Sequence, residues 1–189
     1  LPEDALVEYQ AVEPSAAADV FERFAEETHT GFEPTLHRET AEEFSPEGEF
    51  DILLFANVLS ELSDPDAVAG RYMESVAPDG SPVGIAAADR ETAIGLRQTE
   101  RALERDGYSV WGPQVGLWEN ARPTDRGWSF DVRPDLDVPA FQQALDAAAG
   151  REGEFVNADV QYAFSVVRHD DERMVDIALD TGRFARFSD

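Results

Sequence analysis

Apolar and polar residues follow one another along this chain in segments of strand-like and helix-like spacing. Residues 6–12 are rich in strand-forming side chains, and residues 16–27 repeat apolar side chains every three or four positions, which predicts an amphipathic helix. A weaker strand is predicted at 34–39. Residues 50–58 form a near-continuous apolar run, which is typical of a central parallel strand that is covered on both faces.

The alternation continues to residue 112. Asp64-Pro65 is a helix-start signal, and the predicted helix runs to about residue 77, where Pro78-Asp79-Gly80 is expected to stop it. The later elements are a buried strand at 81–88, a helix at 91–105 capped by Asp89, and a short strand at 108–111. Strands and helices that alternate over short connections predict a doubly wound α/β fold, with a mostly parallel sheet and helices on both faces.

The pattern changes after Gly112. Residues 113–154 are irregular apart from a helix predicted at 139–149. Residues 156–166 alternate strictly between apolar and polar, which favours an antiparallel strand at the edge of the sheet. A hairpin is predicted at 174–187. We therefore expect a Rossmann-like core at 1–112, an insert at 113–154 that contacts a substrate or partner, and terminal antiparallel strands at 155–189 that complete the sheet.

Charge and composition restrict the possible functions. The 189 residues include 40 Asp and Glu against 15 basic residues, all arginine, which gives a formal charge of -25. With 42% hydrophobic residues the chain has enough apolar material to fold. An acidic, lysine-free composition is typical of proteins from salt-accumulating archaea, where the Debye length falls to about 3 Å and carboxylates repel RNA only weakly. The acidic charge therefore indicates adaptation to a high-salt solvent more than it indicates the kind of binding partner.

Several classes of site drop out. With no cysteine, the chain can form no disulfide, Cys-ligated zinc site or iron–sulphur cluster, and it has no Cys nucleophile. The three histidines are scattered, so no metal site is expected. The longest apolar run is far shorter than the ~20 residues of a membrane span, and a cytoplasmic location is expected. Leu1 is not an initiator methionine, so we expect the chain to be a piece of a longer protein.

Two strand ends carry candidate binding residues. Glu13 follows the first predicted strand and precedes a helix, a position from which a carboxylate can accept both hydroxyls of a ribose. The same pattern fits a nicotinamide dinucleotide fold, or an acid placed at a helix N-terminus for its dipole. Arg38, Glu39 and Thr40 follow the weaker strand, where they either contact an adenine ring or form an ordinary exposed loop.

Asn57 follows the strongest strand. A side-chain amide at the carboxyl end of a parallel strand can orient a substrate or cofactor, because it both donates and accepts hydrogen bonds. The alternative is a buried asparagine that bonds only to nearby backbone. The sequence alone leaves both possibilities open.

The segment around Asn57 resembles a known family. Residues 50–64 (FDILLFANVLSELSD) are similar to the fourth-strand motif of class I S-adenosylmethionine-dependent methyltransferases. The Asn-x-Leu-Ser-Glu-Leu run of residues 57–62 resembles, more narrowly, the mitoribosomal small-subunit methyltransferase-like family, which has archaeal and bacterial members. The resemblance covers residues 6–112 and, more weakly, 162–168.

This resemblance implies both a cofactor and a partner. It implies that S-adenosylmethionine is bound, with Glu13 as the ribose-binding acid, Glu39 and Thr40 near the adenine, and Asn57 in the reaction crevice. It also implies a role in ribosomal RNA methylation or in assembly of the small ribosomal subunit. The alternatives are a non-catalytic assembly factor that keeps the fold and a nicotinamide-dependent oxidoreductase, in which the 57–62 run has no role.

The sequence departs from that family at two places. The first strand and its glycine-rich loop are expected to precede residue 1, and no Gly-x-Gly occurs in these residues. We therefore expect this chain alone to bind the cofactor poorly and to be inactive. Many family members carry an iron–sulphur cysteine cluster in the stretch that corresponds to 112–131, where this chain has no cysteine.

Aromatic and basic residues concentrate in one stretch, residues 111–133. Trp118, Arg122, Arg126 and Trp128 lie there, and such side chains bind RNA by stacking on bases and pairing with phosphates. The alternative is a small satellite core at the edge of the sheet. If the chain binds RNA, these residues are the expected contact.

Overall fold

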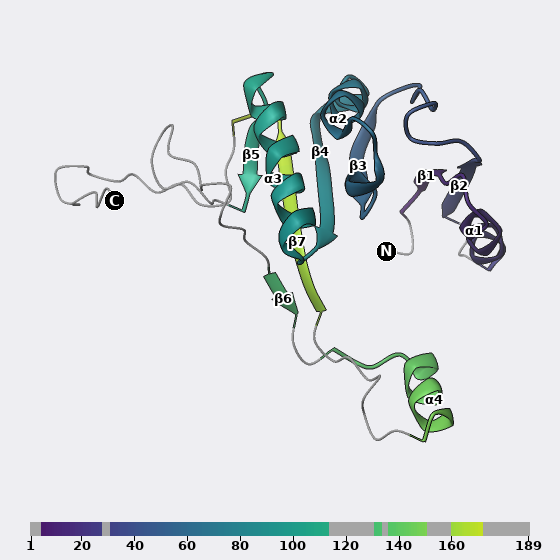
Figure 1. Cartoon of the computed structure of the whole chain (residues 1–189). Helices are drawn as coiled ribbons and strands as arrows, with labels where there is room; N and C mark the ends of the chain where they lie inside the picture. Colours follow the sequence, from purple (N-terminus) through teal and green to yellow (C-terminus); the bar gives the residue numbers. More distant parts are fainter. Residues whose placement is uncertain (1–4, 28–30, 114–130, 134–135, 151–159, 172–189) are drawn as a thin grey trace, which may run out of the picture. The chain divides into compact units, whose positions relative to one another are not determined.

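A computed structural model describes residues 5–27, 31–113, 131–133, 136–150 and 160–171 of the chain (Figure 1). The chain divides into two compact units, Leu1–Gly48 and Glu49–Asp189, which are described separately. The boundaries expected at residues 112 and 154 remain predictions, and the hairpin at 174–187 lies outside the described residues.

The first unit is a β-α-β motif. It consists of β1 (Val7–Val12), α1 (Ala17–Glu26) and β2 (Phe32–His37), and β1 pairs with β2 in parallel from Val7↔Phe32 to Val12↔His37. The Tyr9 ring lies 5.7 Å from the Phe21 ring and 5.5 Å from the Phe32 ring, between centroids. The two predicted strands and the helix between them are confirmed.

The second unit contains a five-stranded sheet. Its strands are β3 (Phe50–Ala56), β4 (Val76–Ala87), β5 (Ser109–Gly112), β6 (Asp131–Arg133) and β7 (Val160–Arg168). The order is β3-β4-β7-β5, and β6 also pairs with β7. β3 and β4 are parallel, whereas β7 runs antiparallel to β4, β5 and β6. The predicted α/β class, with a mostly parallel sheet and one antiparallel strand, is confirmed.

The position of β7 in the sheet differs from the prediction. β7 lies between β4 and β5, not at the edge. Ala163, Ser165 and Val167 form its buried row, whereas the apolar row of Tyr162, Phe164 and Val166 is only half-buried. The sequence pattern misleads because the hydroxyl of Ser165 donates to Glu100 Oε2 at 2.7 Å, so a polar side chain occupies the core face.

Two helices with confirmed N-caps pack in this unit. α2 (Pro65–Met73) begins at Asp64, whose side chain accepts the Ala67 N–H at 3.0 Å. α3 (Arg90–Arg105) begins at Asp89, whose Oδ1 accepts the N–H groups of Glu91 and Thr92. α3 contacts β4, β5 and β7, and Figure 1 shows it lying along the sheet. A short 3-10 turn, η1 (Leu59–Glu61), follows β3, and α4 (Ala140–Ala148) lies within the predicted helix at 139–149.

The start of β4 is a second correction. Pro78-Asp79-Gly80, expected to separate a helix from a strand, lies inside β4, and α2 ends at Met73. The β3–β4 register shifts here, because Phe50 pairs with Val76 whereas Ile52 pairs with Ser81. A Cβ on Gly80 would lie 2.8 Å from the Phe50 carbonyl oxygen, so this irregular pairing requires a glycine.

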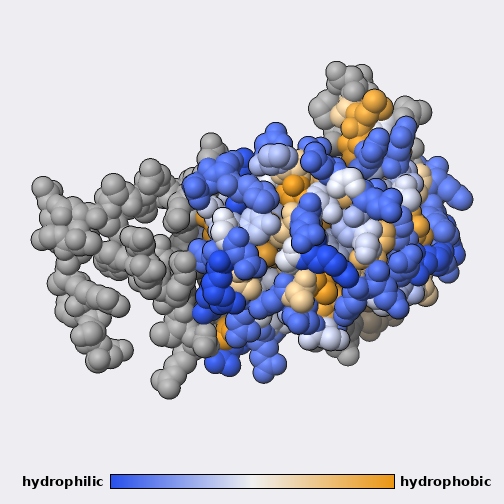
Figure 2. Space-filling view, turned by 90° about the horizontal axis from the view of Figure 1, so that it is seen from above, coloured by the Kyte–Doolittle hydropathy of each residue, from blue (hydrophilic) through white to orange (hydrophobic). Residues whose placement is uncertain are grey.

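The surface reflects the composition. Figure 2 shows hydrophilic residues over most of the face that it draws, with hydrophobic residues in small separate groups. No helix among the described residues is long and apolar enough to cross a membrane.

Candidate functional site

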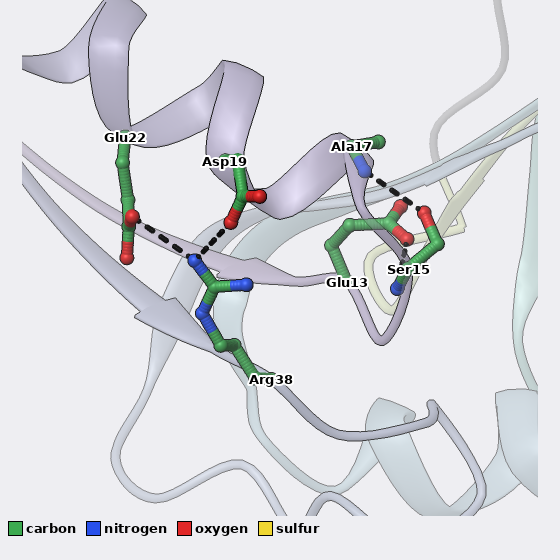
Figure 3. Close-up of polar contacts among 6 residues, drawn as sticks. All are labelled: Glu13, Ser15, Ala17, Asp19, Glu22 and Arg38. Carbon is green, nitrogen blue, oxygen red and sulfur yellow. Dashed lines mark hydrogen bonds and ion pairs between the residues drawn. The ribbon is translucent and has the colours of Figure 1, made fainter.

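Glu13 lies directly after β1, at the turn that leads into α1 (Figure 3). Its N–H donates to the His37 carbonyl oxygen at 3.0 Å, which continues the pairing of β1 with β2. Its Oε1 accepts the N–H of Ser15 at 2.8 Å. Hydrogen bonding from Ser15, first the side chain and then the backbone, lowers the pKa of Glu13, so the carboxylate is ionised at neutral pH.

Both recorded hydrogen bonds to the Glu13 carboxylate come from Ser15, among the residues that the structure describes. Ser15 therefore orients the carboxylate, whose two oxygens keep further lone pairs that can accept from a ligand. A half-buried, ionised carboxylate at the end of a parallel strand fits the hydroxyls of a ribose. Binding of the adenosyl part of S-adenosylmethionine at Glu13 remains a prediction, and no Gly-x-Gly occurs in these 189 residues.

The residues that follow β2 are engaged locally. Arg38 Nη2 lies 2.7 Å from Asp19 Oδ1 and 3.0 Å from Glu22 Oε2, so it clamps the loop to α1 (Figure 3). The Glu43 N–H donates to Thr40 Oγ1 at 3.3 Å, and the Thr40 N–H donates to Glu43 Oε2 at 3.4 Å. This reciprocal pair is a capping box. Glu39 is exposed. Contact of Glu39 and Thr40 with an adenine remains a prediction.

Asn57 lies in the second unit, at the carboxyl end of β3. Its N–H donates to the Ile85 carbonyl oxygen at 2.8 Å, so its backbone is fixed to β4. Its φ is 58°, in the left-handed region that asparagine tolerates better than most residues. This conformation turns the chain out of the strand, and the side chain is exposed. The structure thus excludes the buried asparagine considered above.

Asn57 borders a pocket of about 310 Å³ at the carboxyl ends of β3 and β4. The pocket is closed by η1, by the start of α2 and by the first half of α3. Its polar lining comes from Asn57, Ser60, Glu91, Thr92 and Thr99, and its apolar lining includes Leu59, Leu62, Pro65, Ala86 and Leu96. None of the lining residues is basic. The site can therefore accept hydrogen bonds at several points, and no side chain in it pairs with an anion.

Most of these pocket residues were missed from the sequence. Glu91 and Thr92 belong to the first turn of α3, which follows the strand next to β3, so their place at the same sheet end could have been inferred. Gly95 also lines the pocket, and a glycine inside a long helix was a second signal.

A buried polar cluster anchors α3 beneath this pocket. Arg97 pairs with Glu100 and also donates to the Phe164 carbonyl oxygen, so the helix is tied to β7. The Arg97, Glu100 and Ser165 residues are 5%, 5% and 3% exposed. Burial raises the pKa of Glu100, and Arg97 opposes this shift. The Thr99 hydroxyl donates to Asp66 Oδ1 at 2.8 Å, which joins α3 to α2.

The predicted site residues fall in separate parts of the chain. Glu13, Glu39 and Thr40 belong to the first unit and Asn57 to the second. Trp118, Arg122, Arg126 and Trp128 lie outside the described residues. Within the described ranges, no group of three or more acidic or histidine side chains is arranged to hold a metal ion.

Comparisons with known proteins identify the fold. No family model matches the chain, and no curated protein matches its sequence. A solved candidate methyltransferase from Thermoplasma acidophilum aligns with 87% of this chain at 8% identity and a TM-score of 0.51. A candidate methyltransferase from Bacillus halodurans aligns with 86% at 10% identity and a TM-score of 0.49. The plantazolicin methyltransferase BpumL, solved with SAH, aligns with 86% at 8% identity and a TM-score of 0.47.

The first of these likenesses shows the fold: the chain is similar in its α/β architecture to that solved candidate methyltransferase. The chain spans 57% of the length of the Thermoplasma structure, 83% of the Bacillus structure and 66% of BpumL.

Proposed function

We propose that this chain forms the adenosyl-binding and acceptor-binding parts of an S-adenosylmethionine-dependent methyltransferase. The observation that carries the proposal is the carboxylate of Glu13, which is ionised and oriented by Ser15 at the carboxyl end of a parallel strand. Asn57 occupies the corresponding strand end in the second unit and borders a pocket of ligand size.

Methyl transfer depends mainly on how the protein positions the cofactor and the acceptor. When bound, S-adenosylmethionine supplies a methyl group whose carbon bonds to the acceptor's lone pair while the carbon–sulfur bond breaks, its electrons pass to sulfur and the acceptor loses a proton. The chain's own residues orient the reactants: Glu13 accepts from ribose hydroxyls, and the Asn57 amide orients the acceptor. No covalent intermediate with the protein is required.

Calorimetric titration of the full-length protein with S-adenosylhomocysteine, in high salt, tests the cofactor assignment. We expect binding, and we expect Glu13→Ala to weaken it by about tenfold or more, because a charge-assisted hydrogen bond to the ribose is lost. Glu33→Ala is the matched control, since Glu33 is exposed in the same unit and has no proposed contact with the cofactor. If millimolar ligand produces no heat, the proposal that the protein is a methyltransferase is rejected. If Glu13→Ala binds normally, Glu13 is not the residue that binds the ribose.

The acceptor that we propose is small-subunit ribosomal RNA, in a cytoplasmic, salt-adapted archaeal protein. Support comes from the resemblance of residues 57–62 and from the lysine-free charge of -25, which high salt screens. Trp118, Arg122, Arg126 and Trp128 are the proposed RNA contacts. We expect labelled methyl groups to be transferred to isolated small subunits that lack the modification, and not to mature subunits that already carry it. If neither kind of subunit is labelled, the RNA substrate is contradicted.

A second candidate is a non-catalytic assembly factor that keeps the fold. Binding to small subunits without S-adenosylhomocysteine binding and without methyl transfer is the outcome that selects this function over the enzyme.

A further inference from the structure

The pocket beside Asn57 is lined in part by a glycine inside a helix. Gly95 is the sixth residue of the 16-residue helix α3, far from either end. A glycine inside a helix costs about 1 kcal/mol relative to alanine, so it calls for a local reason. A Cβ placed on Gly95 meets no protein atom within 4 Å, and Gly95 lines the pocket. The missing side chain therefore leaves room in the pocket and relieves no clash with the protein.

The pocket's charge is one-sided. The Asn57 amide and the Ser60 and Thr92 hydroxyls each donate and accept hydrogen bonds, whereas Glu91, the only charge among the lining residues, accepts only. The Asn57 backbone is held in a left-handed conformation that few residues adopt, and such conformations cluster at binding sites. A ligand that donates hydrogen bonds finds several acceptors here, whereas a phosphate or carboxylate finds no cation.

We infer that this pocket binds the methyl acceptor through an amino-bearing ring, with Gly95 as the specificity-determining residue that gives the ring its space. That the ligand is the methyl acceptor rests on the proposed function. Among the residues that the structure describes, all those that line the pocket belong to the second unit. A volume of about 310 Å³ suits one small ring system. Any phosphate attached to that ring remains outside, because an acidic side chain and no basic one lies within.

Two-dimensional NMR titration of the whole chain, without cofactor, measures this binding directly. Cytidine and adenosine carry the ring amino group, and uridine and inosine are their matched counterparts with a carbonyl group. We expect the amide signals of Ser60, Thr92 and Gly95 to shift with the amino-bearing nucleosides, with at least about fivefold weaker binding of the carbonyl counterparts. Equal binding of both members of each pair, or no shift at millimolar nucleoside, overturns the inference.

Substitution of Gly95 separates a binding role from a helix effect. Gly95→Ala is expected to raise the melting temperature by about 2–4 °C, because alanine favours the helix, and to weaken cytidine and adenosine binding by about tenfold. Gly70→Ala is the control: Gly70 lies inside α2, outside the pocket lining, and its Cβ also meets nothing within 4 Å. It should raise the melting temperature and leave binding unchanged. A Gly95→Ala variant that is stabilised and binds normally contradicts the inference.

Two further arms complete the test. Glu91→Gln should weaken the amino-bearing probes severalfold if the carboxylate accepts from the amino group, and unchanged affinity contradicts that contact. Aniline and a short single-stranded cytidine oligonucleotide distinguish a free small amine from a base within RNA as the source of the ring. S-adenosylhomocysteine binding is tested with Glu13→Ala in the other unit. A failure of nucleoside binding at the Asn57 pocket therefore does not decide the cofactor assignment, and a failure of cofactor binding does not decide the pocket.

Discussion

Polar side chains are used in opposite ways in the two units of this protein. In the first unit, Arg38 pairs with Asp19 and Glu22, and the Arg38 and Asp19 side chains are 47% and 59% exposed. In the second, Arg97 and Glu100 form an ion pair that is almost fully buried. The first arrangement is screened by solvent. The second is buried and relies on hydrogen bonds from Arg97 and Ser165, although Arg97 Nε has no partner among the described residues.

The difference teaches where each unit can bind a ligand. Around Glu13 the polar groups are solvated and held by short-range contacts, so a ligand must compete with water. Around Asn57 the pocket lies against α3, which the buried Arg97–Glu100 pair ties to β7. We therefore expect the pocket to keep its shape only while that buried cluster is intact.

The largest expected effect is the loss of one buried partner. Glu100→Ala leaves the Arg97 guanidinium buried without its carboxylate, which is expected to lower the free energy of unfolding by about 3–5 kcal/mol. Chemical denaturation at neutral pH measures the change. Glu100→Gln keeps an acceptor for the Ser165 hydroxyl and should lose less. If Glu100→Ala costs no more than Glu100→Gln, the charge of Glu100 is not what compensates Arg97.

Local signals in the sequence predicted much of this fold. The apolar run that became β3 and the two aspartate caps, Asp64 and Asp89, are determined by neighbouring residues, so their positions were confirmed. The interior place of β7 depends on a bond between Ser165 and Glu100, 65 residues apart. The extension of β4 across Pro78-Asp79-Gly80 depends on an irregular pairing with β3. Such long-range pairings leave no periodic trace in the sequence.

The candidate sites divide in the same way. Glu13 and Asn57 could be placed because each ends a strand, and a strand end is a local feature. The sequence could place Glu91 and Thr92 at the same sheet end, but it could not predict the shape of the pocket, which forms only where α3 lies against β4. Gly84 permits that approach: a Cβ there would lie 2.8 Å from Leu96 Cδ1. Helix and strand must both be in place before Gly95 has a role.

A smaller effect is expected in how the free energy of unfolding depends on pH. Burial raises the pKa of Glu100, so the folded state holds this proton more tightly than the unfolded state does. As pH rises from the ordinary glutamate value of about 4.3 through the raised value, the unfolded state ionises first, and this contribution to stability is lost. The difference in unfolding free energy between the wild type and Glu100→Gln should therefore fall as pH rises across that window. A difference that rises with pH contradicts the assigned direction. Glu13, whose pKa is lowered, acts in the opposite sense, so Glu13→Gln serves as the control.

The smallest effect is expected at the exposed pair. Arg38→Gln removes contacts to Asp19 and Glu22, but water replaces them and salt screens them over about 10 Å at 0.1 M. The melting temperature should stay unchanged within the error of the measurement, at low salt and at high salt. Arg97→Gln under the same conditions should lower it markedly and independently of salt, because the buried pair is shielded from ions. A salt-dependent loss at Arg38 as large as that at Arg97 would mean that the first unit relies on charge pairing for its fold, and that the contrast between the two units does not hold.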